Sequence, residues 1–86
     1  MSTTARIHEI AAIYIESAEA GQNFKVYGNH EELARHAELF KSADEKFGAL
    51  IASDSSLFGC ELRDIRYAIT QGDFNDAKAR FSVLAK

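Results

Sequence analysis

The chain has no proline and no tryptophan, and among its 86 residues it has one cysteine, one methionine and five glycines. Without proline, no position forbids the continuation of a helix, and glycines that stand singly leave long stretches between them. The single cysteine, Cys60, excludes a disulfide framework within the chain and fits a reducing compartment, so we expect a cytoplasmic protein. These absences favour a small helical domain.

The chain also lacks the runs of charged or apolar residues that mark two common kinds of partner. Its net charge is −3, and it has no cluster of lysines and arginines that could neutralise a row of phosphates. No apolar run approaches the roughly 18 residues of a membrane span, and the first ten residues do not resemble a secretory signal. The expected partner is therefore another protein, and neither a nucleic acid nor a membrane is expected.

One pattern, F-x2-A-x3-F-x2-L, occurs twice, beginning at Phe40 and again at Phe74. Its spacing puts all four residues on one side of a helix. The second copy, together with Gly72, resembles the second half of the tetratricopeptide repeat, and the distance between the copies equals the length of that repeat. The first half of the repeat, W-x2-L-G-x2-Y, has no counterpart here. We therefore interpret the copies as two core stripes of equal period and assign no family.

Four amphipathic stretches predict an all-α fold, a compact bundle of four helices in a single domain, residues 1–86. Apolar residues recur along each stretch at intervals of three and four, the period of a helix with one buried face. The first helix can be capped by Thr3 or Thr4. After it, the alternating residues 22–28 are predicted to form an irregular segment that folds back on the core. The expected helices span about 4–20, 30–52, 57–71 and 74–85.

Capping residues predict where these helices begin and end. Gly21 suits the left-handed position that stops the first helix, and Asn29 suits the cap of the second. Gly72 followed by Asp73 suits a helix end and a new cap, so the last two helices should form a hairpin. Gly48, in the middle of the second helix, is expected to mark a bend or a close contact between helices.

The first helix carries more apolar surface than one packing face needs, because its isoleucines cover an arc of roughly 200°. An exposed excess would suit contact with another protein or a symmetric homodimer. A central position in the bundle would instead bury the arc beneath the other helices. Outward-facing residues on the last two helices are further contact candidates. The candidate interaction residues are Ile7, Ile10, Ile13, Tyr14, Ile15, Tyr67 and Val83.

Residues with catalytic or metal-binding potential lack the spacing that such chemistry requires. His36 lies within the apolar arc of the second helix, one turn after Glu32, so this pair could bind a small ligand or a metal. The alternative is a histidine packed on aromatic rings or hydrogen-bonded to another helix. No HExxH motif, Glu-x-x-His pair or glycine-rich phosphate loop is present, and Cys60 has no neighbouring base to activate it. We assign no catalytic residue, cofactor or metal ligand.

The sequence therefore predicts a small non-enzymatic interaction module, a regulator, adaptor or inhibitor that binds a larger protein. One alternative is a structural homodimer built on the isoleucine-rich face of the first helix. The other is a helical protein that binds a small ligand or a metal through His36 and Glu32. All three hypotheses place the function on the surface of the bundle.

Overall fold

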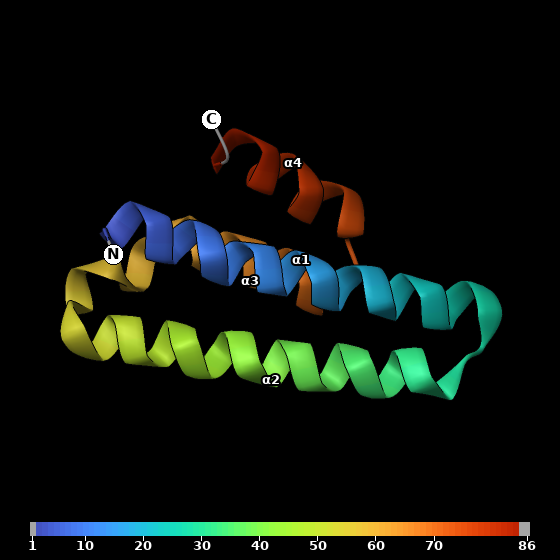
Figure 1. Ribbon diagram of the computed structural model, residues 1–86. Coiled ribbons are helices and arrows are strands. Elements are labelled where there is room, and N and C mark those ends of the chain that lie inside the picture. Colours follow the sequence, from blue (N-terminus) through green and yellow to red (C-terminus); the bar gives the residue numbers. More distant parts are fainter. Residues whose placement is uncertain (1, 85–86) are drawn as a thin grey trace.

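The computed structural model describes residues 2–84, and every element in that range is a helix (Figure 1). The predicted all-α bundle of four helices is confirmed. Residue 85, placed at the end of the fourth predicted helix, lies outside the described range. Within that range, no helix is both long enough and apolar enough to cross a membrane. The elements are α1 (Thr3–Tyr27), α2 (His30–Ser53), the short 3-10 helix η1 (Ser55–Gly59), α3 (Glu61–Thr70) and α4 (Phe74–Leu84).

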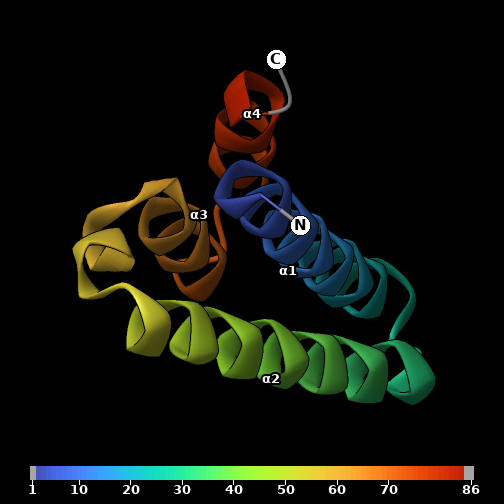
Figure 2. The same ribbon diagram turned by 60° about the vertical axis from the view of Figure 1, so that its left-hand side comes forward.

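The two long helices, α1 and α2, form an antiparallel hairpin, and the shorter α3 and α4 pack against only part of its length (Figures 1 and 2). Helix α1 has 25 residues and α3 has 10, so α3 covers less than half of the hairpin. Helix α1 lies centrally and contacts α2, α3 and α4. The end at which α1 turns into α2 extends beyond the shorter helices (Figure 1).

Helix α1 is longer than predicted. Ser2, rather than a threonine, caps its start and accepts a backbone hydrogen bond of 3.1 Å. Gly28 ends it in the left-handed conformation, with φ 68°, and donates its N–H to the Phe24 carbonyl at 2.7 Å. The predicted stop at Gly21 and the irregular segment 22–28 are therefore wrong. A glycine can stand inside a helix where a neighbouring helix packs too close for a side chain. At Gly21 the neighbour is the His36 ring of α2.

Helix α2 begins where the sequence predicted, because Asn29 caps it. The Asn29 side-chain oxygen accepts the Glu31 N–H at 2.9 Å. The expected close contact at Gly48 is absent, since no atom outside its own helix lies within 4 Å of the position that a Cβ would take there. Gly48 is exposed, so its cost to the helix is not balanced by packing.

The third predicted helix, residues 57–71, is divided in the structure into η1 and α3. The Asp54 carboxylate accepts the N–H of Ser56 at 3.1 Å and so begins a tight 3-10 turn directly after α2. At Cys60 the backbone is extended, with ψ 175°, and α3 starts at the next residue. The local hydrogen bonds of Asp54 compete with the α-helical pattern, which explains why hydrophobic period alone did not reveal the break.

The turn between α3 and α4 follows the prediction closely. Gly72 is left-handed, with φ 74°, and donates its N–H to the Ile69 carbonyl at 3.0 Å. The next N–H, of Asp73, reaches the Ala68 carbonyl at 2.9 Å, which completes a Schellman motif. The Asp73 carboxylate then accepts the N–H of Asp76 at 3.0 Å and caps α4.

The hydrophobic core lies where α1, α2 and α3 meet. The upstream copy of the repeated pattern supplies three buried residues to it, whereas the downstream copy, on α4, has only Ala77 fully buried. Phe81 is half-buried and its ring stacks on His8 of α1, with ring centroids 5.2 Å apart. The two copies are therefore not equivalent, and α4 is a peripheral helix. The central cluster consists of Ile10, Ala11, Tyr14, Ala43, Phe47, Leu50, Leu62 and Ile65.

Candidate functional site

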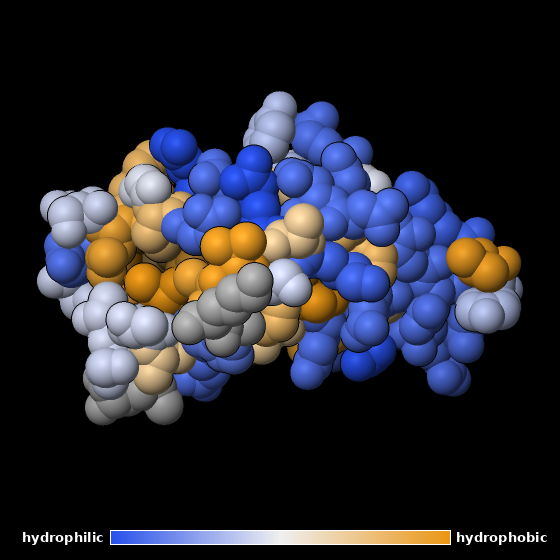
Figure 3. Space-filling model, turned by 90° about the horizontal axis from the view of Figure 1, so that it is seen from above, coloured by the Kyte–Doolittle hydropathy of each residue, from blue (hydrophilic) through white to orange (hydrophobic). Residues whose placement is uncertain are grey.

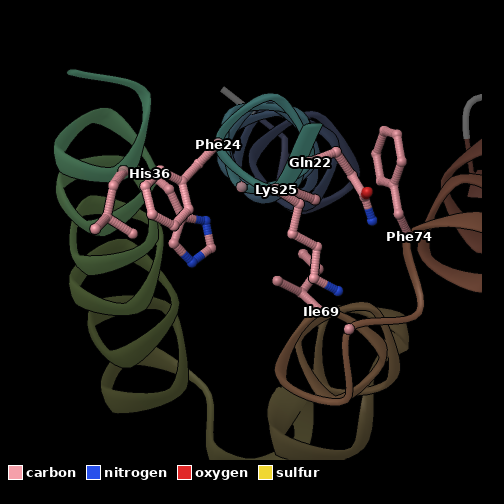
Figure 4. A pocket seen from close by; sticks show the side chains of 10 residues that line it. Gln22, Phe24, Lys25, His36, Ile69 and Phe74 are labelled. Atoms are coloured by element: carbon pink, nitrogen blue, oxygen red, sulfur yellow. The ribbon is translucent and has the colours of Figure 1, made fainter. Parts of the chain in front are cut away.

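An open groove of about 280 Å³ lies at the far end of the α1–α2 hairpin, just beyond the end of α3 (Figure 4). We call it the end groove. Its walls are mostly apolar, and four elements contribute to them. The volume is close to the lower end of the range typical of ligand pockets. The lining residues are Ala18, Gly21, Gln22, Phe24, Lys25, Leu33, His36, Ile69, Gly72 and Phe74.

The floor of the groove is set by the close approach of α1 and α2 at Gly21. A Cβ at this position would lie 3.2 Å from Nδ1 of His36, so the missing side chain makes room for the imidazole. Nδ1 lies 2.7 Å from the carbonyl oxygen of Ser17, and because a carbonyl can only accept, Nδ1 carries the proton. The buried Ser17 hydroxyl in turn donates to the His36 carbonyl at 3.0 Å. His36 thus joins two helices, as one sequence interpretation proposed.

The polar groups at the rim come mainly from α1. Figure 4 shows Lys25 reaching from α1 toward the end of α3, and Gln22 lying on the side of Phe74. The Lys25 amine lies 3.7 Å from the position that a Cβ would take at Gly72, so its charge is held beside the α3–α4 turn. Within residues 2–84, no carboxylate lies within 4.0 Å of this amine. The end groove therefore combines apolar walls with a positive charge at one end.

The predicted isoleucine-rich face of α1 is largely hidden. Ile10 is 4% exposed and Tyr14 is fully buried in the core, so neither can form an interface as the chain is folded. Ile7, Ile13 and Ile15 are partly buried and pack against that core. Of the two alternatives for this helix, the structure shows the central one. A homodimer through this face would have to use the remaining edges of three side chains.

The other two predicted interaction residues are exposed, Tyr67 to 65% and Val83 to 70%. Figure 3 shows apolar surface gathered in one half of the molecule and a separate apolar patch at its far end. At the end where α1 turns into α2, Val26 is 69% exposed and Tyr27 is 78% exposed. None of the seven predicted interaction residues lines the end groove.

The predicted pair of His36 and Glu32 is only half realised at the groove. His36 lines it, but the Glu32 carboxylate lies on Arg35 at 3.3 Å and does not line it. In the part of the chain that the structure describes, no three residues among His, Cys, Asp and Glu are grouped closely enough to hold a metal ion. The His36 imidazole is hydrogen-bonded through Nδ1 to the Ser17 carbonyl of α1, and this bond helps to fix the distance between α1 and α2.

A second cluster of ionisable groups joins α1, α2 and α3 away from the groove. Asp44 accepts the Tyr14 hydroxyl at 2.5 Å and two nitrogens of Arg66 at 2.8 and 3.1 Å. The Arg66 guanidinium also lies 5.2 Å from the centre of the Phe40 ring. Burial, aided by the neighbouring carboxylate, raises the pKa of the Tyr14 hydroxyl well above its ordinary value. This hydroxyl is therefore no acid or base near neutral pH, and the cluster serves to link helices.

The pKa of Asp44 is set by opposing effects. Burial alone would raise it, but the hydrogen bonds from Arg66 and Tyr14 and the arginine charge outweigh burial, so the pKa lies below its ordinary value. The carboxylate therefore stays ionised throughout the neutral range. Nothing in the sequence around Asp44 indicates that its partners lie on two other helices.

Comparison of the chain with family models, curated proteins and solved structures finds no match. The end groove and the exposed apolar residues around the molecule are therefore the surface features that bear on function. Sequence analysis missed the groove because it read Gly21 as a helix stop. The one available signal was the pair of aromatic residues, Phe24 and Phe74, placed beside glycines at two predicted turns.

Proposed function

We propose that the protein is a non-enzymatic interaction module that binds a helical segment of another protein in the end groove. One observation carries the proposal: α3 packs on one side of the hairpin, mainly against α1 and through side chains against α2, and beyond Thr70 the same side of the hairpin is open and apolar. A helix that continued along the line of α3 would find the same kind of surface. Helices bind such grooves through apolar residues spaced one turn apart.

The apolar side chains in the groove walls support a binding role over a catalytic one. Leu33 is 40% exposed at its edge, and its neighbours in the walls are phenylalanines and an isoleucine. Side chains of this kind contribute to binding by leaving water, and an exposed set of them is typical of contact surfaces. The protein would then act as a regulator, adaptor or inhibitor of its partner. We also propose a cytoplasmic location, because the single cysteine, Cys60, is a free thiol and fits a reducing compartment.

A pair of matched variants tests the proposal by affinity capture from a lysate. Leu33→Asp places a charge at the groove, whereas Val83→Asp places the same charge on an exposed apolar residue of α4, away from it. We expect the wild type and Val83→Asp to capture the same protein. Leu33→Asp should lose it by about tenfold or more, since burying one leucine side chain contributes about 1.5–3 kcal/mol.

Circular dichroism of all three proteins is the control, because both substitutions lie at exposed positions and should leave helicity unchanged. Cross-linking from Leu33→Cys, with Cys60 replaced by serine, would then identify the segment of the partner that lies at the groove. If capture were equal for Leu33→Asp and the wild type, or if no partner were recovered in repeated trials, the end groove would not be the binding surface.

A further inference from the structure

The open part of the hairpin has a definite length and a definite charge, which restrict what can lie there. This inference rests on the proposed function. From Ala18 to Lys25, the first and last residues of α1 that line the groove, the helix is about 12 Å long, and Val26 and Tyr27 extend the hairpin to about 15 Å. A partner helix of about three turns would fill it. A longer helix would have to extend past the hairpin end into solvent.

Lys25 is the only lysine or arginine among the residues that line the end groove, and its amine lies at the end nearest to α3. Like Lys41, Lys46 and Lys78, it has no ion-pair partner within residues 2–84, but of these lysines only Lys25 lines the end groove. An unpaired amine beside apolar walls favours a ligand that carries a carboxylate next to its apolar part. The position of Lys25 fixes where that carboxylate must lie, beside the α3–α4 turn.

We infer that the partner is an amphipathic helix with an acidic side chain in its first turn, bound in line with α3 and running in the same direction. Acidic residues are most favourable in the first turn of a helix, where they also meet the unsatisfied N–H groups. With that turn placed at the Lys25 amine, the apolar residues that follow at i+3, i+4 and i+7 face the floor at Gly21 first and then Phe24 and Leu33. The partner helix then points toward Gly28.

Two other occupants share part of this chemistry. A fatty carboxylate also combines an apolar chain with a negative charge, but a single chain presents less apolar surface to the groove walls than a helix does. A second copy of this chain is the other possibility, and it would require an acidic first turn next to exposed apolar residues. The helix is favoured because α3 already packs on this side of the hairpin, with Leu62 and Ile65 in the core and Arg66 bonded to Asp44 of α2.

The probe is a pair of capped helical peptides of about 12 residues, identical in composition, with leucines at i+3, i+4 and i+7 counted from the first residue. One carries two glutamates in its first turn, and the other carries them in its last turn. Binding is measured by NMR titration of the wild type, of Lys25→Gln and of Leu33→Asp at low salt. The first-turn peptide should bind the wild type about three- to tenfold more tightly, and this preference should shrink at high salt.

The preference must also fall by about threefold or more in Lys25→Gln, because comparing both peptides on both proteins cancels any difference in peptide helicity. A nitroxide at the start of the bound peptide should broaden the amide of Gly72, and one at its end should broaden that of Gly28. Broadening in the opposite order, or an equal preference in wild type and Lys25→Gln, overturns the inference.

Three further results distinguish an error about the acidic first turn from an error about the proposed function. If Leu33→Asp abolishes peptide binding but Lys25→Gln leaves the preference unchanged, the groove binds helices and the acidic first turn is wrong. If octanoate shifts the same amides and neither peptide does, the groove takes a small carboxylate, and both proposals fall. Light scattering that gave a dimer for the wild type and a monomer for Leu33→Asp would assign the groove to a second copy.

Discussion

Replacing Leu62 by alanine is expected to destabilise the protein by about 3–5 kcal/mol, because this side chain is completely buried between the central helices. A domain of this size has a free energy of unfolding on the order of 5 kcal/mol. The variant should therefore be close to its unfolding midpoint at room temperature. Urea denaturation followed by circular dichroism measures the change.

Leu33→Ala is the matched control, because the same atoms are removed from a side chain that is 40% exposed. It should cost less than about 1 kcal/mol. Equal losses for the two variants would contradict the assignment of the core to the junction of α1, α2 and α3. A loss below about 1 kcal/mol at Leu62 would do the same.

Replacing Asp44 by alanine is expected to cost about 2–3 kcal/mol, the second largest effect among these predictions. The substitution removes the acceptor of the buried Tyr14 hydroxyl and the two hydrogen bonds from Arg66. Arg66 can turn to water, since its side chain is 43% exposed, but Tyr14 cannot. Glu45→Ala, at an exposed neighbour on α2, should change the free energy of unfolding by less than about 0.5 kcal/mol.

The same cluster predicts a pH dependence. The pKa of Asp44 is lowered in the folded protein, so its contribution is fully present above its unfolded value, about 3.9, and is lost as the pH falls through the folded value. Denaturation at a series of pH values below about 5 should therefore show a steeper loss of stability for the wild type than for Asp44→Ala. Parallel curves would mean that Asp44 titrates alike in both states.

The elements that could be predicted from the sequence are those fixed by local chemistry. Asn29 caps a helix with its own side chain, and the Gly72–Asp73 pair ends one helix and starts another within a few residues. Such signals need no knowledge of distant residues. The period of the apolar residues predicted the number of helices for the same reason.

What could not be predicted depends on residues far apart in the chain. A glycine permits a left-handed turn or a close approach between helices, and only the position of His36 on the opposite helix decides between them at Gly21. Likewise, the apolar arc of α1 has one explanation if a partner covers it and another if three helices do. Ile10 and Tyr14 became core residues through packing that no local pattern encodes.

The uncovered end of the hairpin has a consequence for local motion. Beyond Gly21, α1 is held mainly by the first turns of α2, through contacts such as Phe24 on His30, whose ring centroids lie 5.8 Å apart. A region with few buried contacts opens at a lower free energy than the whole domain, so amides of residues 22–27 should exchange with solvent faster than those of residues 10–17. A ligand in the end groove would slow that exchange, and occupancy could thus be read from the backbone before any partner is identified.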